Sequence, residues 1–272
     1  MRRAKSVRWW LATASVLACV AATTGHAQTA ADGVISAKAM AKDADPDWEV
    51  VSIRPSDPNV TNSKIDVQGR HLIIENQTVE TMLMAGYGLQ KDQIAGAPEW
   101  VRTERFYVDG VSDVAGQPST PQFQNMVRKL LGERFGLKAR KELRELPVFA
   151  LRVGKDGPKL APTKSGPNAR PNQQVNGEQG YRMLRFTNFS MQDLALMMLP
   201  YVDRPLVDQT ELKGRYDFNL QYTYDESRAP TDGTAPPGLF TAIQEQIGLK
   251  LEAVKAPAEV LVIEAVERPS AN

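Results

Sequence analysis

The chain has 272 residues, of which 42% are hydrophobic, and it carries 33 lysines and arginines against 32 aspartates and glutamates. This apolar fraction excludes an intrinsically disordered chain, and the balanced charge argues against nucleic acid as the main partner. With 1 cysteine and 2 histidines, the sequence offers neither an intramolecular disulfide framework nor a cysteine-based zinc site.

Residues 1–27 have the pattern of an export signal. Four basic residues precede an apolar run at 9–22, and small residues mark a cleavage site after Ala27. Two alternatives stay open, an uncleaved N-terminal anchor and a lipoprotein signal ending at Cys19. Cleavage would leave 245 of the 272 residues, remove four basic and no acidic residues, and shift the net charge from +1 to −3. We therefore expect a periplasmic or secreted protein with no transmembrane span after signal removal, no cysteine, and His71 as its single histidine.

The rest of the chain reads as two copies of one unit, offset by 112 residues. Three pairs show the offset: Leu72 and Leu184, Asn76 and Asn188, and the Gly-Leu-Lys triplets at 136–138 and 248–250. Because these anchors share one order and one spacing, we interpret them as an internal duplication.

Hydrophobic periodicity predicts a β-α-β-α-β-β order in each copy. An additional strand is expected at 48–53. In the first copy we expect strands at 65–75, 105–111, 137–143 and 147–153, with helices around 79–87 and 123–131. In the second copy we expect strands at 183–187, 215–222, 249–254 and 259–266, with helices around 191–199 and 239–247. This order predicts an α+β fold of two related units, with mixed or antiparallel sheets and helices packed on one face.

Composition predicts the boundaries between these parts. Residues 28–46 are small and unpatterned, which is typical of a flexible tail. The first unit is expected at 47–153 and the second at 182–268. Glycine, proline, asparagine and glutamine dominate 154–181, so we expect a linker there.

Motifs for catalysis are weak in this sequence. His71 has no partner in an HExxH pattern, and neither a GxSxG motif nor a phosphate-binding loop is present. Asp208, Asp217 and Asp225 lie near Arg215 along the chain, and two carboxylates could flank a sugar bond. The favoured interpretation of these aspartates is a solvated or ion-paired strand edge. We therefore predict no catalytic residue, no metal ligand and no cofactor.

Two residues are candidate ligand contacts. Trp100 follows a loop-like Ala-Pro-Glu stretch, and an aromatic ring near a loop can stack on a ligand or pack on its own domain. Arg215 precedes a predicted strand of the second copy. We expect the ligand site in the cleft between the two copies, which 154–181 bridges.

Four motifs occur in order along the chain: Trp-Glu-Val-Val-Ser-Ile-Arg-Pro at 48–55, Gln-Ile-Ala-Gly-Ala-Pro-Glu-Trp at 93–100, Arg-Pro-Leu-Val-Asp-Gln-Thr at 204–210 and the ending at 259–270. Together they resemble a domain of unknown function that is expanded in Acidobacteria. The same domain also occurs attached to membrane zinc-peptidase sensors of the Bla-regulator type. The resemblance implies a secreted or envelope protein, and it transfers neither catalytic residues nor a protease role. Residues 239–266 are also similar to small modules at the start of secretins and TonB-dependent receptors.

These observations favour a non-catalytic binding or interaction module of the cell envelope. Its partner would be an envelope protein, a peptide or a polymer, and nucleic acid is not expected. One alternative is a carboxylate-dependent hydrolase acting on an envelope polymer. A second alternative is a structural subunit that assembles through exposed strand edges.

Overall fold

The computed structural model describes residues 38–166, 169–178, 180–230 and 233–269. The predicted signal at 1–27, including its cleavage site at Ala27, lies outside the described residues. Within the described ranges, no helix has the length and apolar character needed to cross a membrane.

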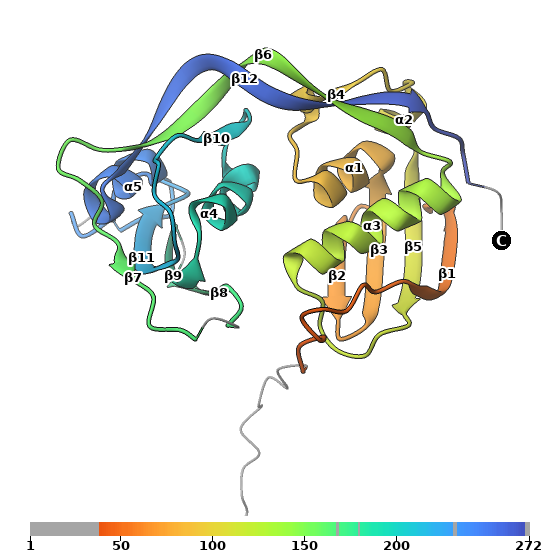
Figure 1. Cartoon of the computed structure of the whole chain (residues 1–272), viewed down its shortest axis with the longest axis horizontal. Helices are drawn as coiled ribbons and strands as arrows, with labels where there is room; N and C mark the ends of the chain where they lie inside the picture. Colours follow the sequence, from red (N-terminus) through yellow and green to blue (C-terminus); the bar gives the residue numbers. More distant parts are fainter. Residues whose placement is uncertain (1–37, 167–168, 179, 231–232, 270–272) are drawn as a thin grey trace, which may run out of the picture. The chain divides into compact units, whose positions relative to one another are not determined.

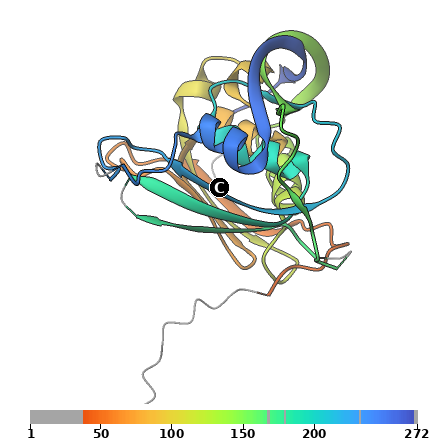
Figure 2. The ribbon, with the colours of Figure 1, turned by 90° about the vertical axis from the view of Figure 1, so that its left-hand side faces the viewer.

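The first lobe is an antiparallel four-stranded sheet covered by helices on one face (Figures 1 and 2). Its strands follow the order β1 (Trp48–Pro55), β5 (Arg105–Ser112), β3 (His71–Thr78) and β2 (Lys64–Gln68). Its helices are α1 (Val79–Tyr87), α2 (Trp100–Thr103) and α3 (Thr120–Arg134). Alternate residues of β3, among them Leu72 and Ile74, are buried against the helix layer. Apolar residues of α1 and α3 complete this core, including Met82, Leu83 and Leu130.

The second lobe repeats this strand order. Its sheet runs β7 (Ala161–Pro162), β11 (Tyr216–Thr223), β9 (Tyr181–Phe189) and β8 (Asn172–Glu178). Its helical segments are α4 (Met191–Met198), the 3-10 turn η2 (Leu199–Tyr201) and α5 (Leu239–Ile247). The strand order of the two lobes corresponds element by element, and the tandem duplication inferred from the sequence stays a prediction about their origin.

Two long strands connect the lobes (Figure 1). The antiparallel pair of β6 (Lys138–Val153) and β12 (Leu249–Ala265) is extended by short parallel strands, β10 (Leu206–Asp208) on β6 and β4 (Ile94–Ala95) on β12. A 3-10 turn, η1 (Lys91–Gln93), precedes β4. Leu261 and Ile263 of β12 belong to the first core, whereas Leu151 of β6 belongs to the second. Neither core is therefore built from one contiguous stretch, and the predicted α+β class is confirmed.

The structure differs from our prediction of two separate strands at the end of each copy. The sequence pattern divided each of these elements into two predicted strands near a proline. In the structure, β6 and β12 each continue through that proline. Pro147 pairs with Lys255, and Pro257 pairs with Glu145, in the stretch of β6 and β12 that neither β10 nor β4 joins. A strand without a neighbour on its outer side tolerates proline, because no ladder hydrogen bond is lost there.

Two segments expected to be tail and linker are built into the fold. Of the predicted tail at 28–46, residues 38–46 are described, and Met40 is 2% exposed with its N–H donating to the carbonyl of Gln117 at 2.8 Å. Of the predicted linker at 154–181, residues 161–162 form β7 and residues 172–178 form β8. Both segments are polar and depend on contacts with distant parts of the chain, so local patterns do not reveal them.

Candidate functional site

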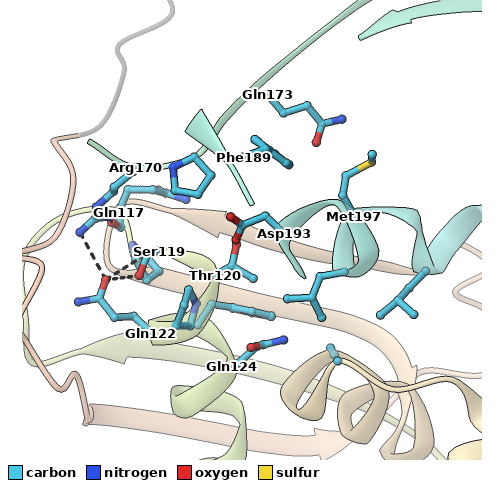
Figure 3. Close-up of a pocket in the computed structure, with 18 of the residues that line it drawn as sticks. Gln117, Ser119, Thr120, Gln122, Gln124, Arg170, Gln173, Phe189, Asp193 and Met197 are labelled. Atoms are coloured by element: carbon cyan, nitrogen blue, oxygen red, sulfur yellow. Dashed lines mark hydrogen bonds between the residues drawn. The ribbon is translucent and has the colours of Figure 1, made fainter. Parts of the chain in front are cut away.

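A cavity of about 1090 Å³ lies between α1 and the start of α3 on one side and α4 on the other (Figure 3). We call it the interlobe pocket. The segment before α3 and the segment leading into β8 also line it. The apolar side chains that line it are Ala39, Met84, Ala85, Leu89, Pro118, Pro121, Phe123, Ala169, Pro171, Phe189, Leu196, Met197, Leu199 and Pro200.

At one end of the pocket, the segment that ends α1 contacts α4 and η2. Gly88 ends α1 with a left-handed φ of 66°, and a Cβ placed there would lie 2.7 Å from Cδ2 of Leu196. Gln90, which is 8% exposed, donates from Nε2 to the carbonyl of Leu199 at 2.6 Å. These contacts set the separation of the two helices above the cavity.

At the other end, polar side chains tie three segments together. The side-chain oxygen of Gln122 accepts from the N–H of Ser119 at 2.9 Å, which forms a capping box at the start of α3. The amide nitrogen of Gln122 donates to the carbonyl of Ala41 at 2.7 Å. Arg170 donates to the carbonyls of Met40 and Gln117. Because these donors are occupied, they hold the walls in place.

Arg215, one of the two candidate ligand contacts, lines the pocket on its second-lobe side. Its Nη2 donates to the carboxylate of Asp193 at 2.7 Å, and its Nε donates to the carbonyl of Asn188 at 2.8 Å. The same Asp193 oxygen accepts from the N–H of Ser190 at 2.9 Å at the start of α4. Arg215 therefore supplies positive charge to the pocket wall while it also anchors the first turn of α4.

The second candidate contact, Trp100, is placed elsewhere. It begins α2 and meets Phe106 edge-on, with ring centroids 6.5 Å apart. The guanidinium of Arg268 lies 5.0 Å from its ring centroid. Trp100 does not line the interlobe pocket. The structure therefore does not bring Trp100 and Arg215 together, and Trp100 packs on its own lobe.

The three aspartates near Arg215 in sequence each bind their own surroundings. Asp208 accepts from the N–H of Thr210 at 2.9 Å, Asp217 accepts from the N–H of Asn188 at 2.8 Å, and Asp225 accepts from the hydroxyl of Ser227 at 2.6 Å. The backbone N–H of Asn188 lowers the pKa of Asp217. The hydroxyl of Ser227 lowers the pKa of Asp225. A general acid at neutral pH needs a raised carboxyl pKa, so neither residue is suited to that role.

The comparisons with known proteins give a family. A family model described as "Protein of unknown function (DUF3738)" matches residues 80–266. The chain belongs to this family. The DUF3738 match begins inside α1 and extends into the end of β12, so it covers α1, α3 and α4 around the pocket. Comparisons with curated proteins and with solved structures gave no match, so no activity is transferred to this DUF3738 protein from a relative.

Most pocket residues of this DUF3738 chain were missed by the sequence reasoning. Met84 and Met197 line the cavity, whereas Met82 and Met198 of the same two helices are buried in the cores. One feature of the sequence could have indicated the pocket. Met84 and Met197 lie beside the predicted core faces of two equivalent helices. An apolar residue just outside a core face needs another partner.

Proposed function

We propose that this chain is an exported, non-catalytic binding protein of the cell envelope. Its interlobe pocket would take an extended, largely apolar segment of another envelope protein. The observation that carries this proposal is the cavity of about 1090 Å³, whose walls come from both lobes. Pockets for small ligands have volumes of roughly 300–1,000 Å³, so this one has room for several residues of a peptide.

The side chains of the pocket favour a peptide over a sugar polymer. Sugar sites use exposed aromatic faces, and Trp100 does not line this pocket. Of the two phenylalanines that do, Phe189 is 6% exposed and Phe123 packs against the first core. The walls instead offer Met84, Leu196 and Met197. Methionine adapts its shape to varied apolar partners, which suits a surface that accepts peptide side chains.

The arrangement of carboxylates supports binding over hydrolysis. Asp193 is the one carboxylate among the described residues that line the pocket, and it is held by Arg215 and Ser190. A glycosidase needs two carboxyl groups that flank the scissile bond. In the described ranges, every carboxyl whose pKa clearly departs from its usual value is lowered.

The envelope location rests on the export-signal pattern of residues 1–27. The resemblance to the Acidobacteria-expanded domain that also accompanies Bla-regulator-type sensors agrees with that location. After signal removal the chain would carry no cysteine, which suits an oxidising compartment.

The proposal is tested by selecting phage-displayed heptapeptides on the purified exported protein and measuring their affinity by calorimetry. We expect peptides with several apolar residues, whose dissociation constant rises at least tenfold with Met197→Arg. A matched introduction of positive charge on β6, Leu143→Arg, should leave the affinity for the peptide unchanged, because Leu143 is 76% exposed and lies outside the pocket. The absence of any selected peptide, or equal affinity for both variants, would overturn the proposal. If the protein instead cleaved a bound peptide, and if Asp193→Asn abolished that cleavage, a hydrolase function would replace this proposal.

A further inference from the structure

Side chains cap the outward-facing backbone groups of three strands in the two sheets. On β11, the N–H of Gln221 donates to Oε1 of Gln246 at 2.8 Å, and Nε2 of Gln246 donates back to the carbonyl of Gln221 at 2.7 Å. On β2, the carbonyl of Val67 accepts from Nε2 of Gln117 at 3.1 Å. On β1, the carbonyl of Val51 accepts from Arg134 at 3.0 Å. These contacts occupy groups that could otherwise pair with another strand.

The free edge of β8 carries no such cap in the described part of the chain. β8 pairs with β9 from Asn172 opposite Thr187 to Glu178 opposite Tyr181. Gln221 lies opposite Met183 of β9 and directs its N–H away from β9 to Gln246, so Met183 directs its own backbone groups to Asn176 of β8. Because antiparallel pairs alternate, Gln173 and Val175 then turn their N–H and C=O groups away from β9. In the described ranges, no hydrogen bond from elsewhere in the chain reaches these backbone groups.

The sequence of β8 also lacks the usual protection of a strand edge. Its residues are Asn-Gln-Gln-Val-Asn-Gly-Glu, with no lysine, arginine or proline. Free edges are commonly blocked by lysine, proline or a bulge. Val175 is instead an exposed apolar residue at 56% exposure.

Space for a ligand lies along the same strand. Gln173 lines the interlobe pocket, and a second hollow of about 480 Å³ touches the other end of β8. The residues around this second hollow are Val175, Asn176, Gly177, Tyr181, Arg182 and Tyr224. A chain paired with β8 would therefore run from one hollow to the other.

We propose that β8 is a docking strand, to which an extended segment of a partner protein adds as a further strand of the second sheet. This inference rests on the proposed function and specifies how the peptide is held. Main-chain hydrogen bonds to Gln173 and Val175 supply affinity, and alternate peptide side chains enter the interlobe pocket.

Charge in the two hollows identifies the class of segment. Arg170 and Arg215 line the interlobe pocket with Asp193, and Arg182 lines the second hollow. Three arginines against one carboxylate favour an acidic segment over a basic one. The occupant is therefore an extended peptide with alternating apolar residues and acidic flanks.

The experiment uses the tightest-binding selected heptapeptide and the full exported protein. Val175→Pro removes the outward N–H of β8 without removing a bond to β9. We expect it to weaken peptide binding at least tenfold, while Val175→Thr, which keeps that N–H, stays within twofold. Methylating alternate backbone nitrogens of the peptide should weaken binding by a similar factor.

Amide hydrogen exchange on the unaltered protein provides a readout that does not depend on the folding of the proline variant. Peptide should slow exchange at Val175 at least tenfold and leave Gln221, already bonded to Gln246, unchanged. Pocket-dependent peptide binding without protection at Val175 would overturn the docking strand and leave the proposed function standing. If light scattering showed that the protein self-associates and the slowed exchange at Val175 followed this self-association, β8 would pair with a second copy of the chain. That result would also overturn the docking strand.

Discussion

Arg215 and Asp193 form an ion pair that joins the segment before β11 to the first turn of α4, with Nη2 and the carboxylate oxygen 2.7 Å apart. Asp193 occupies the third position of the helix and closes a capping box with Ser190. One carboxylate thus has two structural tasks, as an acceptor for the helix start and as a partner for the pocket arginine.

Replacing Asp193 separates these tasks. Asp193→Ala loses both the cap and the ion pair, so we expect a loss of about 1–2 kcal/mol in the free energy of unfolding. Asp193→Asn keeps an acceptor for the N–H of Ser190 and should cost less than about 1 kcal/mol. Urea denaturation measures both. Equal losses in the two variants would mean that the charge, and not the cap, carries the effect.

Local patterns predicted the helices and their starts. The expected starts at 79 and 191 follow Thr78 and Ser190, which are the N-caps of α1 and α4, and each accepts a hydrogen bond from a backbone N–H of the first turn. The helix periodicity also placed Met82 and Leu194 in the cores correctly. These features depend on residues three or four apart, so a single sequence shows them.

Features that depend on distant partners were not predicted. The polar strand β8 is recognisable through its pairing with β9, and Met40 is buried through contacts with residues far along the chain. The interlobe pocket depends on how β6 and β12 set the two lobes against each other. Of the residues that line the pocket, the sequence singled out Arg215, whose role as a ligand contact stays a prediction, and missed the apolar walls.

Asn76 and Asn188 share a backbone conformation in the two lobes. Their φ angles are 54° and 62°, and each side chain donates to a loop carbonyl, Asn76 to Val60 at 2.8 Å and Asn188 to Ala169 at 2.6 Å. An alanine in this left-handed region is strained by about 1–2 kcal/mol, whereas glycine is not.

We therefore expect Asn76→Ala to be about 1 kcal/mol less stable than Asn76→Gly, and the same order at Asn188. Both variants lose the hydrogen bond of the asparagine side chain, so the difference between their free energies of unfolding isolates the backbone strain. Chemical denaturation of the four variants measures it. Equal stability of the alanine and glycine variants would contradict strain at these positions.

Replacing either of two glycines with alanine should change the stability of the protein, but in opposite directions. Gly248 ends α5 with φ of 69°, and a Cβ there would overlap the carbonyl oxygen of Gly157. Gly248→Ala should therefore destabilise the protein by more than about 2 kcal/mol. Gly132 is an exposed residue of α3 with open space where a Cβ would lie, so Gly132→Ala should stabilise by about 0.5–1 kcal/mol. Thermal unfolding compares both, and a stabilising Gly248→Ala would disprove the overlap.

Tyr222 should make the protein sensitive to alkaline pH. Its side chain is 2% exposed, and its hydroxyl has no hydrogen-bond partner of good geometry in the described part of the chain. Burial raises the pKa of Tyr222 to about 12, from a usual value of 10.0. The unfolded chain therefore loses this proton at a lower pH than the folded chain. Stability is unaffected below about pH 10 and falls between about pH 10 and 12, by roughly 2–3 kcal/mol at the upper end.

Tyr222→Phe removes this titrating group and also the unpartnered hydroxyl. We expect the variant to match or exceed the native chain in stability at about pH 8, because a buried hydroxyl without a partner costs free energy. It should also retain its unfolding midpoint better between about pH 10 and 11.5. Tyr107→Phe, at a half-buried position on β5, is the matched control and should leave the alkaline loss in place. If the Tyr222→Phe and native chains lose stability in parallel above about pH 10, other groups govern alkaline unfolding.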